Sequence, residues 1–79
     1  MKIVKIQRIY LPERSIDRDD FMEIIPANVR VRFRIENSKS VKCYQTSFEH
    51  ANNQSIIDNI SGYPYNLKGS SFIFVDDLF

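Results

Sequence analysis

One pattern occurs twice in this chain: an apolar strand, a short capped helix and a second strand. In the second copy, residues 41–48 predict a strand, and apolar residues recur at helical spacing over 56–60 before Gly62, a residue type that suits the left-handed position after a last helical turn. The apolar run 72–75 predicts the closing strand. Because each strand and each helix must cover its apolar face against another element, this repeat is the feature that most constrains the fold.

The first copy has the same order of elements. Residues 9–11 predict a strand, and Asp17 is a candidate N-cap for a helix. Phe21, Ile24 and Ile25 predict the buried face of that helix, which a proline and an asparagine shortly afterwards would end.

A strict alternation of apolar and basic residues predicts the next strand. Apolar side chains occupy the odd positions from Val29 to Ile35, and Arg30, Arg32 and Arg34 occupy the even positions between them. A period of two residues is typical of a strand with one buried face. The three arginines are therefore expected to face away from the core.

This element order predicts an α+β fold, the ferredoxin-like βαββαβ arrangement, in a single domain over residues 1–79. Two strand-helix-strand units joined by a hairpin around 37–40 would form a four-stranded antiparallel sheet with both helices on one face. Residues 1–8 would extend the first strand, add an edge, or support a dimer. The other face of the sheet would stay open, and it is the leading candidate site.

Composition limits the possible functions. The net charge is +1, so affinity for nucleic acid must come from local placement of charge. No apolar stretch approaches the roughly 20 residues that a membrane span needs. The single cysteine, Cys43, cannot form an internal disulfide and is typical of a reducing compartment. An intracellular protein, in the nucleus or the cytoplasm, is expected.

Signals for catalysis are absent from the sequence. The only glycines are Gly62 and Gly69, so there is no glycine-rich phosphate loop, and no nucleophile elbow occurs. His50 and Cys43 lack the spacing of metal ligands. The chain is not expected to be an enzyme or to need a cofactor or metal.

Three segments carry a resemblance to a known family. They are the aliphatic-aromatic-aliphatic run 9–11, the capped acidic segment 16–25, and the run 58–63 followed by Leu67-Lys68-Gly69. In this order they resemble the first strand, the first helix and the second helix with the following strand entry of the RNA recognition motif. The resemblance covers residues 9–75 and implies a ferredoxin-like sheet whose open face binds single-stranded RNA through aromatic and basic side chains.

The third predicted strand departs from that family. If Phe48 faces inward, the outward positions hold no stacking aromatic; they are Val41, Cys43, Gln45 and Ser47. The other register turns Lys42 and Tyr44 outward, but it misplaces Phe48 before the helix, so the first register is favoured. A one-residue shift would likewise move Phe72 and Phe74 between the core and the open face, and the core is their expected place.

Seven basic or aromatic residues are the candidate RNA-binding set: Tyr10, Arg8, Arg30, Arg32, Arg34, Lys42 and Tyr44. Tyr10 is expected to point outward, either to stack on a base, which is worth about 1–3 kcal/mol, or to fill the sheet surface. The arginines would contact phosphates or stack on bases. The alternative for them is charge protection of an edge strand.

Two functions follow from these residues. The first is an RNA-binding module with largely electrostatic contacts, weak sequence preference and strong salt dependence. The alternative is a degenerate recognition motif that binds a protein with an acidic or aromatic patch. Outward Cys43 and Gln45 favour the protein partner, whereas outward Lys42 and Tyr44 favour RNA.

The last four residues, Asp76-Asp77-Leu78-Phe79, are similar to the acidic tips by which some bacterial single-stranded DNA-binding proteins recruit partners. Such short tips match by chance often, and a fraying chain end is the simpler interpretation.

Overall fold

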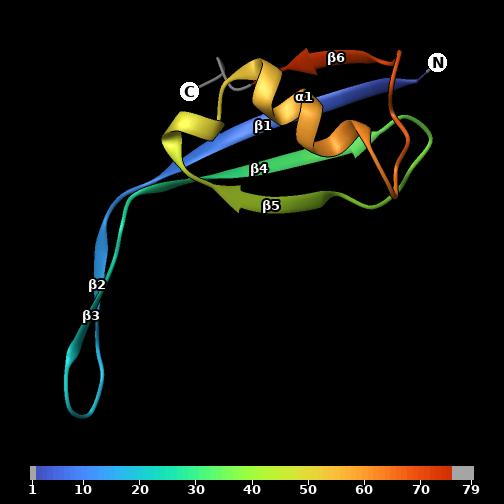
Figure 1. Cartoon of the computed structure of the whole chain (residues 1–79). Helices are drawn as coiled ribbons and strands as arrows, with labels where there is room; N and C mark the ends of the chain where they lie inside the picture. Colours follow the sequence, from blue (N-terminus) through green and yellow to red (C-terminus); the bar gives the residue numbers. More distant parts are fainter. Residues whose placement is uncertain (1, 76–79) are drawn as a thin grey trace.

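A computed structural model describes residues 2–75 of the chain, so the acidic tip at 76–79 lies outside the described residues. The elements in chain order are β1 (Ile3–Leu11), β2 (Arg14–Asp17), β3 (Met22–Ile25), β4 (Asn28–Ile35), β5 (Lys42–Thr46), the 3-10 helix η1 (Phe48–His50), α1 (Asn53–Ser61) and β6 (Ser71–Phe74). Four strands form one sheet in the order β5-β4-β1-β6, and β2 and β3 form a separate hairpin (Figure 1).

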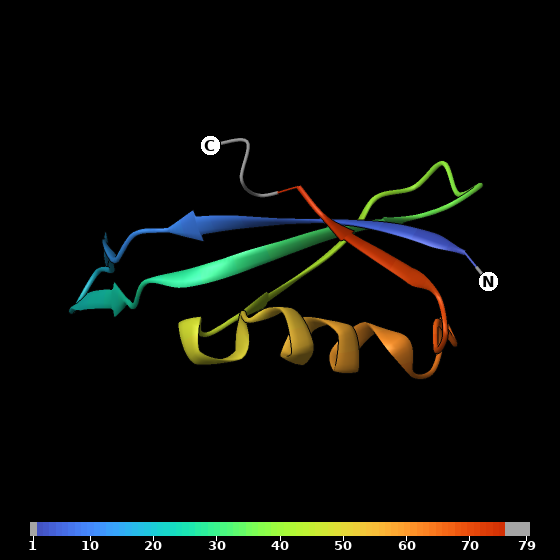
Figure 2. The same cartoon turned by 90° about the horizontal axis from the view of Figure 1, so that it is seen from above.

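The predicted ferredoxin-like βαββαβ topology is wrong. The sheet is mixed, because β4 runs antiparallel to β1 and β5, whereas β6 runs parallel to β1. Over residues 2–75 there is one α-helix, α1, and it covers one face of the sheet (Figure 2). No helix of residues 2–75 covers the opposite face, which we call the open face (Figure 2). The predicted hairpin around 37–40 does connect β4 to β5, through a turn in which Asn37 adopts a φ of 68°.

The predicted first helix is a β-hairpin arm, which we define as residues 13–25. β1 and β4 are paired up to Leu11 and Asn28, and pairing resumes in the arm at Arg14 and Ile25. Between these two pairs the strands contain Pro12 and Pro26, which have no N–H to donate to a ladder. The ladder is therefore interrupted there, and the arm leaves the sheet (Figure 1).

Local preferences in the arm also favour strands over a helix. Isoleucine, which occurs at positions 16, 24 and 25, is β-branched and favours strands. The Asp19-Asp20 pair lies at the tip, where the Arg18 backbone N–H donates to the Phe21 carbonyl at 2.8 Å and closes the turn. Phe21 and Ile24, expected in the core, are 63% and 64% exposed.

The core lies between the sheet and α1. Its buried side chains come from β1, β4, α1 and the connecting segments; they are Val4, Ile6, Val29, Val31, Phe33, Ile35, Ala51, Ile56, Ile60 and Leu67. The alternation predicted for β4 is confirmed, since every odd position from 29 to 35 is buried. Phe72 and Phe74 pack against this core as expected, opposite Val4 and Ile6 on β1.

Helix α1 has a side-chain cap at its start, and its end differs from the prediction. The Asn52 side chain caps it by accepting a hydrogen bond from the Ser55 N–H at 2.9 Å. Gly62 follows the last turn with a φ of −86°, so its predicted left-handed conformation is wrong. Asn66 and Gly69 adopt positive φ values of 54° and 84° in the loop to β6 instead.

Candidate functional site

The open face of the sheet carries three exposed arginines, Arg30, Arg32 and Arg34, which we call the arginine row. Cross-strand pairing fixes their neighbours: on β1 these are Ile9, Gln7 and Lys5, and on β5 Gln45 and Cys43 lie opposite the first two. β4 is a central strand, between β5 and β1. Protection of an edge strand therefore does not explain the row.

Successive members of the row lie about 6.6 Å apart along the strand, because alternate residues share a face at roughly 3.3 Å per residue. Arg34 Nε donates to the Ser38 carbonyl at 2.9 Å, and Arg32 Nη1 reaches Gln7 Oε1 at 3.5 Å. Over residues 2–75, no member of the row forms an ion pair with a carboxylate; the ion pair found there joins Arg18 and Glu23 in the arm. The guanidinium groups keep most of their donors for a ligand.

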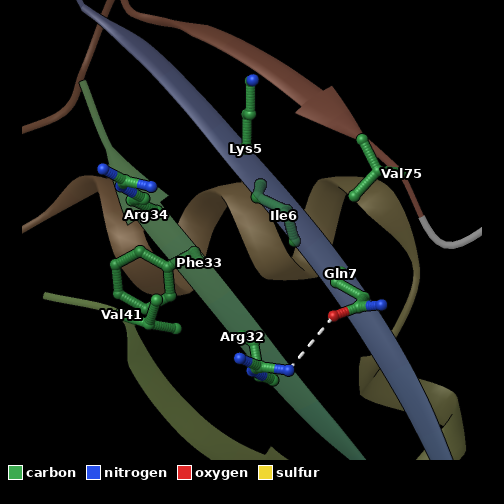
Figure 3. A pocket seen from close by; sticks show the side chains of 8 residues that line it. All are labelled: Lys5, Ile6, Gln7, Arg32, Phe33, Arg34, Val41 and Val75. Atoms are coloured by element: carbon green, nitrogen blue, oxygen red, sulfur yellow. Dashed lines mark hydrogen bonds between the residues drawn. The ribbon is translucent and has the colours of Figure 1, made fainter. Parts of the chain in front are cut away.

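A shallow depression lies between β1 and β4 on this face, with a volume of about 150 Å³ (Figure 3). Among residues 2–75 its lining includes three cations and no acidic residue; the lining residues are Lys5, Ile6, Gln7, Arg32, Phe33, Arg34, Val41 and Val75. Drug-sized ligands need pockets of roughly 300–1,000 Å³. The depression therefore has the size and charge to hold a small anionic group, such as one phosphate.

An adjoining depression of about 370 Å³ extends the same face towards the turn after β4. It shares Lys5 and Arg34 with the first depression and is also lined by Glu36. A carboxylate thus lies at this end of the cationic surface, so the strongest positive potential is expected nearer Arg32 and Arg30.

Tyr10 and Arg8 do not lie on the open face, so their expected placement is wrong. Val4 and Ile6 on β1 face the core, and a period of two then turns residues 8 and 10 to the helix side. Arg8 Nη1 donates to the Ala51 carbonyl at 2.8 Å, and its guanidinium lies 5.0 Å from the centroid of the Phe74 ring.

Tyr10 stacks on Phe48 of η1, with ring centroids 5.9 Å apart and an interplanar angle of 26°. Phe48 was expected in the core, but η1 places it over Tyr10 at the end of the sheet, where it is 53% exposed. Tyr10 is itself 57% exposed. The two rings cover the helix-side end of the sheet and add no stacking surface to the open face.

The favoured register of the third predicted strand is confirmed. Pairing with β4 puts Cys43 and Gln45 opposite Arg32 and Arg30 on the open face, and it turns Lys42 and Tyr44 to the helix side. Lys42 Nζ lies 5.4 Å from the centroid of the Tyr65 ring. Of the seven predicted residues, the structure brings together Arg30, Arg32 and Arg34; it places Tyr10, Arg8, Lys42 and Tyr44 on the other face.

Lys42 and Tyr44 take part in a second cluster, on the helix side of the sheet. With Tyr63, Pro64 and Tyr65 they line a depression of about 200 Å³ between β5 and the loop after α1. Tyr63 is 92% exposed. The sequence showed this Tyr-Pro-Tyr segment only as a loop, because nothing in its pattern predicts that it folds back onto β5.

Burial raises the pKa of the Tyr44 hydroxyl above its usual value. The same hydroxyl has no hydrogen-bond partner among the described residues. The folded state therefore holds this proton more tightly than the unfolded state, and the resulting stability is present below pH about 10 and is lost as pH rises through the folded-state pKa.

Tyr44→Phe is expected to leave the melting temperature at pH 7 unchanged or slightly higher, because it removes an unpaired hydroxyl. It should also reduce the loss of melting temperature above pH about 10. Thermal unfolding followed by circular dichroism across this pH range measures both effects. Tyr63→Phe, at a ring that is 92% exposed, is the control and should lose melting temperature at alkaline pH as the wild type does. The same dependence of melting temperature on pH in all three proteins would contradict a raised pKa at Tyr44.

Lys5 and Gln7 are site residues that the sequence interpretation missed. It placed the first strand at residues 9–11 and left open whether residues 1–8 extend it, add an edge or support a dimer, whereas β1 runs from Ile3 to Leu11. The signal was present, because Val4 and Ile6 alternate with Lys5 and Gln7 as they do in a half-buried strand. Extending that alternation would have placed both polar residues beside the arginine row.

Two further properties of residues 2–75 bear on function. No group of three or more His, Cys, Asp or Glu in residues 2–75 is arranged to hold a metal ion. Within the same span, α1 is too short and too polar to cross a bilayer, and no other helix there is a candidate span.

Comparison with protein-family models, with curated proteins and with solved structures finds no match to this chain. The resemblance to the RNA recognition motif therefore gains no independent support, and the topology that it implies is not the one observed. A function has to be argued from the open face itself.

Proposed function

We propose that this chain is a nucleic-acid-binding module that holds single-stranded RNA by its phosphates on the open sheet face. The observation that carries the proposal is the arginine row, exposed on a central strand with Lys5 directly opposite Arg34. Like charges on opposite positions of neighbouring strands destabilise a sheet. A surface that keeps them without a paired carboxylate in residues 2–75 is suited to an anionic ligand.

Arginine is the side chain best suited to phosphate, because its planar fork of N–H donors can bind two phosphate oxygens at once. The row offers three such contacts, and the ammonium of Lys5 can contact a fourth phosphate as a point charge. A single strand bound through about four phosphates should lose affinity with salt at a slope of roughly −2 to −3 in log K against log salt. With the aromatic rings on the helix side, contacts to the backbone should dominate, and sequence preference should be weak.

A protein partner with an acidic surface is the second candidate. Outward Cys43 and Gln45 favour it, because within residues 2–75 the open face lacks the aromatic platforms on which bases stack. The two candidates differ in what they require of the ligand: RNA offers regularly spaced phosphates, whereas a folded acidic protein must match the shape of this face. RNA is preferred because the row repeats at a regular interval along one strand.

Binding of RNA would place the protein inside the cell, in the nucleus or the cytoplasm. The exposed thiol of Cys43 is compatible with that location, since reducing compartments keep such thiols free.

Arg32→Ala is expected to weaken binding of a short labelled uridine run by about three- to tenfold and to reduce the salt slope by about 0.7. Arg32 is the middle member of the row and lines the 150 Å³ depression. Fluorescence anisotropy at low and moderate salt, with uridine, adenosine and mixed sequences, measures affinity, slope and sequence preference together.

Arg14→Ala is the matched control, because it removes the same charge from the exposed base of the arm and should leave affinity nearly unchanged. Equal losses in the two variants would mean that binding follows net charge, not the open face. Absence of binding at low salt would contradict the RNA proposal and favour the acidic protein partner.

A further inference from the structure

The arm gives this chain far more surface than a compact domain of its length has. The radius of gyration is 15.0 Å, whereas about 12 Å is expected for a compact chain of this length. The accessible surface is 5865 Å², roughly 900 Å² above the ~5000 Å² expected for a compact monomer. Both views show the arm projecting beyond the sheet (Figures 1 and 2).

The arm exposes three large apolar side chains. Phe21, Met22 and Ile24 are 63%, 60% and 64% exposed. β2 and β3 pair with each other alone, and an isolated two-stranded ribbon is marginally stable at best in water. Apolar side chains gathered on such an element mark a surface that another molecule covers.

The charge of the arm indicates which surface covers its apolar side chains. Residues 13–25 hold five acidic and two basic side chains, which gives the arm a net charge of −3; since the whole chain is +1, the rest carries +4. The acidic residues include Asp19 and Asp20 at the tip, and the basic ones outside the arm include the arginine row. One chain thus has an acidic, apolar projection and a basic, shallow face that complement each other.

We infer that two copies of this chain exchange arms, so that the arm of each copy lies across the open face of the other. The acidic tip would meet the arginine row, and the apolar side chains of the arm would cover exposed apolar residues of that face, such as Ile73 and Val41. A reciprocal exchange closes about a two-fold axis. The accessible surface that exceeds that of a compact monomer, roughly 900 Å², is close to the ~800 Å² that each partner buries in a standard interface.

A dimer held together only by contact between the two arms is less favourable than arm exchange. It would bring together two segments that each carry a charge of −3, which opposes association. Exchange onto the open face covers the arm and also neutralises the row. It occupies the same face as the proposed RNA site, so arm and RNA should compete, but the inference does not require that RNA binds.

The test is a charge swap measured by sedimentation velocity at low and high salt. The first variant, Arg30→Glu with Arg32→Glu, reverses the charge at two of the three row positions; the second, Asp19→Lys with Asp20→Lys, reverses the arm tip. The wild type should dimerise, and more weakly at high salt. Each variant alone should raise the dimer dissociation constant at least about tenfold, because the arm tip and positions 30 and 32 then carry like charge.

An equimolar mixture of the two variants should restore the dimer, because each arm then meets a face of opposite charge. Recovery in the mixture cannot be produced by misfolding of either variant. A wild type that stays monomeric at high protein concentration in low salt would overturn the inference. So would a variant that dimerises as the wild type does, or a mixture that stays monomeric.

Cys43 reports directly on whether the face is covered. It is the only cysteine, it is exposed, and it lies opposite Arg32 on the open face. Its alkylation by a maleimide should slow several-fold as the wild-type concentration rises, and should stay fast in the arm-tip variant. A dimer whose Cys43 reacts at the monomer's rate would contradict docking on this face.

The two proposals fail separately in these experiments. The arm-tip variant keeps the whole arginine row, so it should still bind RNA even though it no longer dimerises. Loss of RNA binding with dimerisation intact would reject the RNA proposal alone, whereas RNA binding by a strictly monomeric wild type would reject arm exchange alone.

Discussion

Replacing Ile6 with alanine is expected to remove about 3–4 kcal/mol from the free energy of unfolding, a large share of the total for a chain of this length. Ile6 is fully buried on the central strand β1, with Phe33 and Phe74 opposite it on the two neighbouring strands. Ile→Ala in a core typically costs about 2–5 kcal/mol. A chain of this length has roughly 4–12 kcal/mol to lose.

Urea unfolding followed by circular dichroism measures this loss, and thermal unfolding should show a melting temperature lower by about 15–25 °C. Ile3→Ala is the matched control: the same residue type on the same strand, 41% exposed at its beginning. It should cost less than about 1 kcal/mol. Similar losses in both variants would contradict the central, buried position of β1.

Three elements could be predicted because each has one period and one buried face. In β4 the alternation of apolar residues and arginines fixed the strand and its two faces. In α1 the spacing of Ile56 and Ile60 fixed the face that packs on the sheet. The register of β5 was predicted from an inward Phe48; Cys43 and Gln45 do face away from the core, although Phe48 itself lies in η1 and is 53% exposed.

The arm could not be predicted by this reasoning, because its apolar residues serve no core of this chain. Phe21, Ile24 and Ile25 have helical spacing. Such spacing predicts a buried helix face only where the apolar side chains are covered by their own domain. The signal that was overlooked is the pair of prolines, Pro12 and Pro26, which border the arm on both strands. Two prolines at adjacent rungs of a ladder, one on each strand, indicate that the ladder is interrupted, and so a hairpin that continues beyond the sheet.

The sequence predicted the arginine row at the centre of the candidate site, but not the residues of β1 that border it. The arginine row follows from one strand alone, but the neighbours of each arginine depend on the phase of β1. Buried Val4 and Ile6 determine which side chains of β1 face the core. The family resemblance predicted the opposite assignment, with Tyr10 on the open face. A one-residue difference in phase moved Tyr10 off the open face and brought Lys5 onto it.

Removal of the arm is expected to give a folded monomer. Replacing residues 12–27 with Asn-Gly joins Leu11 to Asn28, which are already partners, through the commonest kind of two-residue hairpin turn. The core residues all lie outside the removed segment. The free energy of unfolding should therefore change by less than about 1 kcal/mol, while the radius of gyration falls from 15.0 Å to about 11 Å.

Small-angle X-ray scattering and sedimentation velocity on this variant measure its size and association state. The matched control keeps the arm but carries Phe21→Ser, Met22→Ser and Ile24→Ser, at three side chains that are more than half exposed. That control should stay extended when monomeric and should dimerise more weakly, because the charge of the arm is unchanged but its apolar contact is gone. If the armless chain unfolded, the arm would be part of the folding unit; if it still dimerised, the interface would lie elsewhere on the sheet.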